Sequence, residues 1–115
     1  MPYLKLNTNK TINKDESVQL LSQLSQAVAK ATDKPERYIM IELNDSKNML
    51  FAGNSEPLAF IECKSIGLTA SQSKSLSSSL CQLLETALQI RPDRIYIEFK
   101  DCPAEFWGWD GTTFG

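Results

Sequence analysis

The chain has 115 residues, of which 42% are hydrophobic and 23% are charged, and its formal net charge at pH 7 is −2. These values are typical of a single soluble domain, and the absence of a basic run excludes the usual nucleic-acid-binding classes. No apolar stretch approaches the roughly 20 residues that cross a bilayer, and no basic segment precedes an apolar one at the start of the chain. We therefore expect a cytoplasmic protein with no signal peptide and no membrane partner. Secretion by a route that needs no signal peptide stays open.

The composition narrows the chemistry, because the chain contains no histidine. Ser/His and Cys/His nucleophiles, His-ligated zinc and the commonest general base are therefore excluded. The cysteines are Cys63, Cys81 and Cys102, and they form no CxxC pair, so we expect reduced thiols. The groups whose unperturbed pKa lies near neutrality are then the α-amine, at roughly 7.7 to 8, and the thiols, at about 8.5.

The first half of the chain predicts a strand, a helix and a second strand. Leu4 and Leu6 alternate with more polar residues at the period of a strand, and Asn13 with Glu16 is typical of a helix N-terminus. The apolar residues that follow recur at helical spacing and are Val18, Leu21, Leu24, Val28 and Ala31. Pro35 ends the helix, and the segment YIMIEL at 38–43 predicts a buried strand because it is rich in β-branched and aromatic residues.

The second half repeats this order. The segment PLAFIECKSI at 57–66 predicts a third strand, and Thr69 with Gln72 predicts a capping box for a second helix. The apolar face of that helix consists of Leu76, Leu80, Leu83, Leu84, Ala87 and Leu88. The segment RPDRIYIEFK at 91–100 then nearly repeats KPERYIMIEL at 34–43, since in both a basic residue, proline, an acid and arginine lead into an apolar strand.

The repeated order predicts one α+β domain that spans residues 1–115. A helix that connects two strands of one sheet implies parallel strands and a right-handed crossover. Two such βαβ units give a two-layer α/β sandwich, a four-stranded sheet with two helices on one face. The strands are rich in apolar residues, so we expect the other face to be too apolar for water and to be covered by further copies of the chain.

Several segments spread along the whole chain resemble one family. They are MPYLKLNTN, ATDKPERYI, FAGNSEP, SIG at 65–67, LCQLLETALQIRPDRIYI and GWDGTTFG. Together they resemble the macrophage migration inhibitory factor family of the tautomerase superfamily. The resemblance implies a trimer in which three sheets surround a central channel and active sites lie between neighbouring subunits.

The resemblance also implies site residues for keto–enol tautomerisation of phenylpyruvate-like or dopachrome-like compounds, without a metal or other cofactor. Pro2 would be the catalytic base, because removal of Met1 leaves it a terminal secondary amine whose pKa falls on burial and near Lys34. Lys34 would bind the carboxylate of a 2-oxo acid or its enol, and Ile66 would supply a backbone N–H and an apolar wall. The other implied substrate-binding residues are Tyr38, Trp109 and Phe114 in an aromatic pocket, and Tyr96 from the adjacent subunit. The residues alone favour the simpler interpretation that Pro2 is the first residue of an edge strand, where its lack of an N–H is harmless.

The chain departs from the family pattern at positions that affect function. Glu98 stands where well-known members carry an asparagine that faces the substrate, and a carboxylate there would repel an anionic 2-oxo acid. Leu58 and Ile61 replace the two cysteines of a CxxC, so thiol-disulfide oxidoreductase activity is not expected. The alternative function is a non-catalytic, cytokine-like or regulatory trimer that works through its surface.

Overall fold

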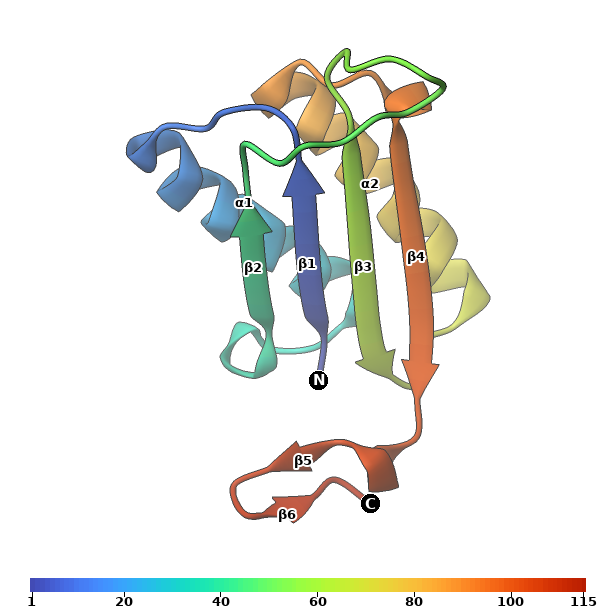
Figure 1. Cartoon of the computed structure of the whole chain (residues 1–115). Coiled ribbons are helices and arrows are strands. Elements are labelled where there is room, and N and C mark those ends of the chain that lie inside the picture. Colours follow the sequence, from blue (N-terminus) through green and yellow to red (C-terminus); the bar gives the residue numbers. More distant parts are fainter.

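The computed structural model describes residues 1–115 and consists of two layers, a mixed sheet and two helices that cover one of its faces (Figure 1). The strands are β1 (Tyr3–Thr8), β2 (Met40–Asn44), β3 (Ala59–Ile66) and β4 (Ile95–Cys102), in the order β2-β1-β3-β4. β2 runs parallel to β1 and β4 runs parallel to β3, whereas β1 and β3 are antiparallel. The predicted pair of βαβ units in one α+β sandwich is therefore confirmed. No helix is long and apolar enough to cross a bilayer.

Both helices begin where the sequence predicts. α1 spans Lys14–Thr32, and the Asn13 side chain accepts a hydrogen bond of 2.8 Å from the backbone N–H of Glu16. α2 spans Ala70–Leu88, and Thr69 and Gln72 form the full capping box. These bonds satisfy backbone N–H groups that have no partner within the helix.

The core lies between the helices and the sheet. Each helix buries one leucine-rich ridge against the alternating inward residues of the strands, as the periods of 3.6 and 2 require. The buried cluster consists of Leu4, Leu6, Ile12, Leu20, Leu24, Val28, Ala59, Ile61, Cys63, Leu68, Leu76, Leu80, Leu84, Leu88, Ile90 and Ile95.

Two local predictions are wrong. Val18 is 62% exposed, because the buried ridge of α1 runs through Leu20, Leu24 and Val28 instead. Residues 38–43 do not form one buried strand, since Tyr38 ends the 3-10 turn η1 (Glu36–Tyr38) and β2 begins at Met40. β2 lies at the edge of the sheet, where one side lacks a neighbouring strand, and none of its residues is buried.

The expectation of an apolar outer sheet face is also wrong. The side chains that point away from the helices are largely polar or charged, because the apolar residues of each strand alternate with them and point inward. They include Lys5, Glu42, Glu62, Lys64, Glu98 and Lys100. Lys5 and Glu62 form an ion pair of 3.5 Å across β1 and β3. Met40 and Tyr96, each 66% exposed, lie among these charged residues, so the face is mixed and not uniformly apolar.

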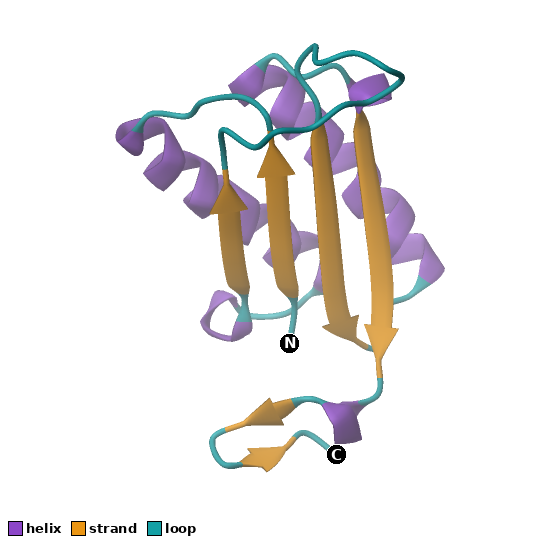
Figure 2. Ribbon diagram, viewed as in Figure 1, coloured by secondary structure: helices purple, strands orange, loops and turns teal.

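The C-terminal segment forms a small hairpin below the sheet (Figure 2). After the 3-10 turn η3 (Ala104–Phe106), β5 (Gly108–Trp109) pairs antiparallel with β6 (Thr112–Thr113). Asp110 and Gly111 connect them with φ values of 52° and 79°. A two-residue loop with positive φ at both positions matches the twist of a hairpin.

Candidate active site

An open groove of about 710 Å³ lies where the start of the chain, η1 and the C-terminal hairpin meet. In Figure 1 the N-terminus lies at the end of the sheet that faces β5 and β6. The outer face of the sheet forms the floor of the groove, η1 forms one side, and the hairpin segment forms another. The lining residues are Met1, Pro2, Tyr3, Arg37, Tyr38, Ile39, Met40, Glu42, Lys64, Lys100, Cys102, Phe106, Trp107, Gly108, Trp109 and Phe114.

Pro2 is held at the base of this groove. It is less than 2% exposed, and its carbonyl accepts a hydrogen bond of 3.1 Å from the backbone N–H of Met40. Before Met1 is removed, the terminal amine belongs to Met1. Burial lowers the pKa of this amine below its usual value, and the positive charge of the nearby Lys34 lowers it further. The environment at this end of β1 therefore favours a neutral amine.

Three aromatic rings form one wall of the groove. The Tyr38 ring meets the edge of Trp109 at a centroid distance of 5.7 Å and that of Phe114 at 6.1 Å. Trp109 and Phe114 stack on each other at 5.6 Å, across the hairpin that brings them together. The structure thus gathers three of the predicted substrate-binding residues beside Pro2. Such a wall suits a planar apolar group.

The groove also carries charged groups. Arg37, Lys64 and Lys100 line it, together with one carboxylate, Glu42. The Tyr3 hydroxyl donates a hydrogen bond to Glu42, which raises the pKa of Tyr3 to about 12 and lowers the pKa of the Glu42 carboxyl. The groove is therefore positively charged overall, which suits an anionic ligand.

The remaining predicted residues do not line this groove within one protomer. Lys34 is half-buried after the end of α1 and acts on the amine from there. Ile66 is the last residue of β3, and the next two backbone N–H groups donate to the Asp101 carboxylate at 2.9 and 3.1 Å. This contact fixes the turn that follows Ile66.

Tyr96 and Glu98 lie on the outer face of β4, away from Pro2. The Tyr96 ring packs on Phe51 at 4.6 Å in a separate apolar pocket. Glu98 is paired in register with Glu62 of β3 and is exposed. One protomer therefore brings Pro2 together with Tyr38, Trp109 and Phe114, and leaves Tyr96 and Glu98 on another part of the same sheet face.

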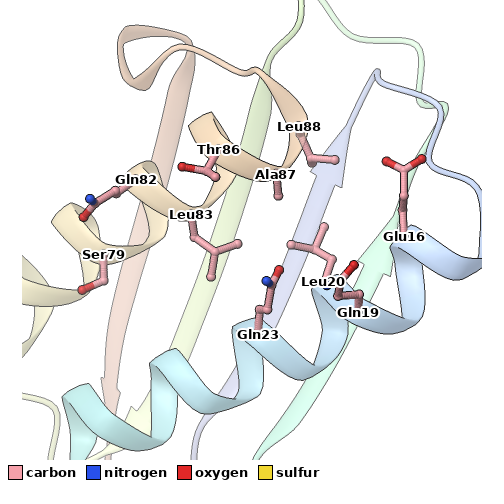
Figure 3. A pocket seen from close by; sticks show the side chains of 10 residues that line it. All are labelled: Glu16, Gln19, Leu20, Gln23, Ser79, Gln82, Leu83, Thr86, Ala87 and Leu88. Atoms are coloured by element: carbon pink, nitrogen blue, oxygen red, sulfur yellow. The ribbon is translucent and has the colours of Figure 1, made fainter.

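A second cavity, of about 520 Å³, lies between α1 and α2 on the helical side of the molecule (Figure 3). Amides and hydroxyls of Gln19, Gln23, Ser79, Gln82 and Thr86 line much of it. Its one ionisable group, Glu16, hydrogen-bonds the side-chain amide of Asn13. Glu16 is exposed and no hydrogen bond joins it to the Ser79 or Thr86 hydroxyl, so we take the groove at Pro2 as the candidate active site.

Comparison with known proteins gives the family. The family model described as macrophage migration inhibitory factor matches residues 1–115. The chain belongs to the macrophage migration inhibitory factor family. The family member from Meriones unguiculatus is 41% identical over 115 residues, 99% of each chain. The Brugia malayi homologue is 39% identical over 116 residues and covers 100% of both. The crystal structure of the family homologue from Prochlorococcus marinus has a TM-score of 0.92 and 40% identity, covering 98% of this chain and 99% of that one.

Membership in the macrophage migration inhibitory factor family supports isomerase chemistry in general, on a tautomerase-type fold. The structure also fits the expectation for the thiols, since Cys63, Cys81 and Cys102 are all free. Cys63 is buried in the core, and burial raises the pKa of its thiol to about 11.

Sequence reasoning missed several groove residues. Arg37, Lys64, Lys100, Tyr3 and Glu42 line the groove, but none was a candidate. Part of the signal was present: the Asp110–Gly111 dipeptide is a strong hairpin signal. It would have predicted that Trp109 pairs with Thr112 and that Phe114, two residues further on, lies on the same face of the hairpin as Trp109.

Proposed function

We propose that this protein is a keto–enol tautomerase of phenylpyruvate-like or dopachrome-like compounds, and that the Pro2 amine is its general base once Met1 is removed. One observation carries the proposal. Pro2 is buried at the base of a groove that also presents aromatic rings and unpaired cations. A planar aromatic 2-oxo acid has a ring and a carboxylate that these two features match.

The chemistry needs one base that moves a proton between carbon and oxygen. In the direction of the enol, the neutral Pro2 amine takes the proton from the carbon between the ring and the carbonyl. The protonated amine then gives this proton to the carbonyl oxygen, which becomes the enol oxygen, and the amine is neutral again. Burial and Lys34 already lower the pKa of the Met1 amine. Pro2 is more deeply buried than Met1, so the same causes act on its amine after removal of Met1. A base with a pKa near the working pH is the most effective.

The other predicted residues have roles that follow from their places. Tyr38, Trp109 and Phe114 would pack against the ring, Lys34 would attract the carboxylate, and Ile66 would offer a backbone N–H and an apolar wall. Tyr96 and Glu98 would reach the site only from a neighbouring subunit, since they lie elsewhere on the sheet. We therefore include a homotrimer with shared sites in the proposal.

A regulatory binding trimer is the second candidate, and the exposed aromatic residues favour it. Phe106 is 84% exposed and Trp109 is 53% exposed, which are features of a surface that binds a partner. The two functions differ in their need for Pro2. A binding surface does not require a free secondary amine at the start of the chain.

The test compares three forms of the protein with phenylpyruvate as substrate: the processed chain with free Pro2, the chain that retains Met1, and the processed Pro2→Gly variant. Retention of Met1 turns the Pro2 nitrogen into an amide, so tautomerisation should be lost while circular dichroism and sedimentation stay unchanged. Pro2→Gly keeps a less well positioned amine and should lose roughly 10²- to 10⁴-fold in kcat/KM. Equal rates for the processed and Met1-retaining forms would refute the proposal and favour the binding protein.

A further inference from the structure

Three cations of the groove have no acidic partner. Arg37 comes from η1, Lys64 from β3 and Lys100 from β4, so three separate elements direct positive charge to one cavity. The ion pairs of the structure are Lys5 with Glu62 and Arg91 with Asp93, and neither includes a groove cation. A cluster of unpaired cations costs stability unless a ligand neutralises it.

Lys64 and Lys100 are direct cross-strand neighbours. They are paired in register between β3 and β4, and both side chains project from the outer face of the sheet. Like charges placed directly opposite each other destabilise a sheet. Tyr3 is the register partner of Lys64 on its other side, and Met40 is the partner of Tyr3, so this row of four residues crosses the floor of the groove. The lysine pair is therefore part of the cavity floor beside Pro2.

The Arg37 side chain makes no hydrogen bond or ion pair, in contrast to Arg94, the arginine that matches it in the internal repeat. Arg37 and Arg94 occupy the same place in the segments KPER at 34–37 and RPDR at 91–94. Both guanidinium groups lie over an aromatic ring, Arg37 over Tyr38 at 4.8 Å and Arg94 over Phe51 at 5.2 Å. Arg94 is 6% exposed and also donates hydrogen bonds to the carbonyls of Phe51, Asn54, Glu56 and Pro57.

Arg37 has none of these acceptors. Its planar guanidinium is held by Tyr38 at the edge of the groove with its donors unused. A guanidinium binds a carboxylate with two parallel hydrogen bonds, which makes it suited to a carboxylate ligand.

The carboxylates on the outer face of the sheet either have a hydrogen-bond or ion-pair partner or lie outside the row formed by Met40, Tyr3, Lys64 and Lys100. Glu42 accepts hydrogen bonds from Tyr3 and Asn44. Glu62 is paired with Lys5 at 3.5 Å. Glu98 lies opposite Glu62, two residues before Lys100 on β4, and does not line the groove. Within the protomer three cations therefore face one carboxylate, Glu42, and a Glu98 supplied by a neighbouring subunit would offset only one more of these charges, so the groove keeps a net positive charge.

We infer that the groove takes an aromatic substrate with two carboxylates, the second of which binds to Lys64, Lys100 and Arg37. The inference rests on the proposed function, in which the first carboxylate belongs to the 2-oxo acid and is attracted by Lys34. Lys34 alone can attract the first carboxylate, so Arg37, Lys64 and Lys100 remain for a second one. A volume of about 710 Å³ leaves room for a substituted ring.

The test compares phenylpyruvate with 4-carboxyphenylpyruvate, which differs only by a carboxylate on the ring. We expect kcat/KM at low ionic strength to be roughly tenfold higher for the dicarboxylate, at roughly twofold for each of the three solvent-accessible cations. Lys64→Gln, Lys100→Gln and Arg37→Gln should each lower this ratio, and the triple variant should bring it to about one. Lys74→Gln removes an exposed lysine of α2 outside the groove and should leave the ratio unchanged.

A binding measurement separates this inference from the proposed function. The quenching of Trp107 and Trp109 fluorescence reports the groove directly, because the chain has 2 tryptophans and both line it. Terephthalate should bind roughly tenfold more tightly than benzoate, and the triple variant should abolish the difference. If neither oxo acid is turned over but this difference holds, the inference stands and the tautomerase proposal falls. If phenylpyruvate is turned over but the second carboxylate improves neither turnover nor binding, the inference is wrong and the tautomerase proposal stands.

Discussion

The C-terminal hairpin should control substrate affinity through one glycine. Gly111 has a φ of 79° at the turn between β5 and β6, and no atom lies within 4 Å of a Cβ built there. Gly111→Ala therefore causes no clash and strains only the backbone, by about 1 kcal/mol. That energy is about a fivefold change in the equilibrium between the ordered and the open hairpin. Because β5 and β6 have two residues each, closure of the hairpin depends on this turn together with the packing of Trp109 and Phe114 on Tyr38.

The hairpin carries Trp109, while Pro2 is held by the sheet. Gly111→Ala should therefore raise KM for phenylpyruvate by about two- to fivefold and leave kcat nearly unchanged, because substrate binds only to the ordered form. Gly53→Ala is a matched control. Gly53 has a φ of 76°, its Cβ would also meet no atom within 4 Å, and its two-residue turn lies outside the groove. If both variants give the same KM, the aromatic wall is not part of the site.

Four further predictions concern specificity, the core, assembly and the thiols. Glu98→Asn should lower KM for phenylpyruvate at low salt, because it removes a repulsive carboxylate that a neighbouring subunit would supply; unchanged kinetics would place Glu98 outside the site. Leu80→Ala should lower the free energy of unfolding by about 2 to 5 kcal/mol in chemical denaturation, since Leu80 is fully buried, and a loss below about 1 kcal/mol would contradict the packing. Sedimentation at micromolar concentration should give a trimer, and a stable monomer would remove the shared site. A thiol reductant should change neither circular dichroism nor tautomerase rate, whereas a mobility shift on non-reducing gels would reveal an unexpected disulfide.

Much of the fold could be predicted from the sequence because its determinants are local. The caps at Asn13 and Thr69 depend on residues three positions apart, and the repeated order of elements gave the sheet. The register of α1 was predicted less well. Leu20 stands four residues before Leu24 and continues the face of Leu24 and Val28, whereas Val18 stands six residues before Leu24 and lies about 120° around the helix, so the helical period contained the answer.

The prediction of an apolar outer sheet face does not separate the two sides of each strand. Lys64, Glu98 and Lys100 already stand at alternating positions of β3 and β4, so the period of two contained the answer.

Only part of the candidate site could be predicted, and the cause is not the same as for the sheet face. The family resemblance supplied Pro2 and the aromatic wall, but the groove cations depend on which strand ends meet η1 and the hairpin. That is a property of the topology, and no short segment of sequence contains it.

An NMR titration of the Pro2 nitrogen in the processed protein shows whether the Pro2 amine can serve as the base. Burial and Lys34 lower the pKa of the Met1 amine, and Pro2 lies deeper at the same place, so we expect the neutral, active form of the Pro2 amine to appear as pH rises through a lowered pKa. We predict an amine pKa clearly below the ordinary value of roughly 7.7 to 8. The kcat/KM for phenylpyruvate should rise with pH along a limb with the same pKa. An ordinary amine pKa, or a kcat/KM that does not follow the titration, would contradict the account.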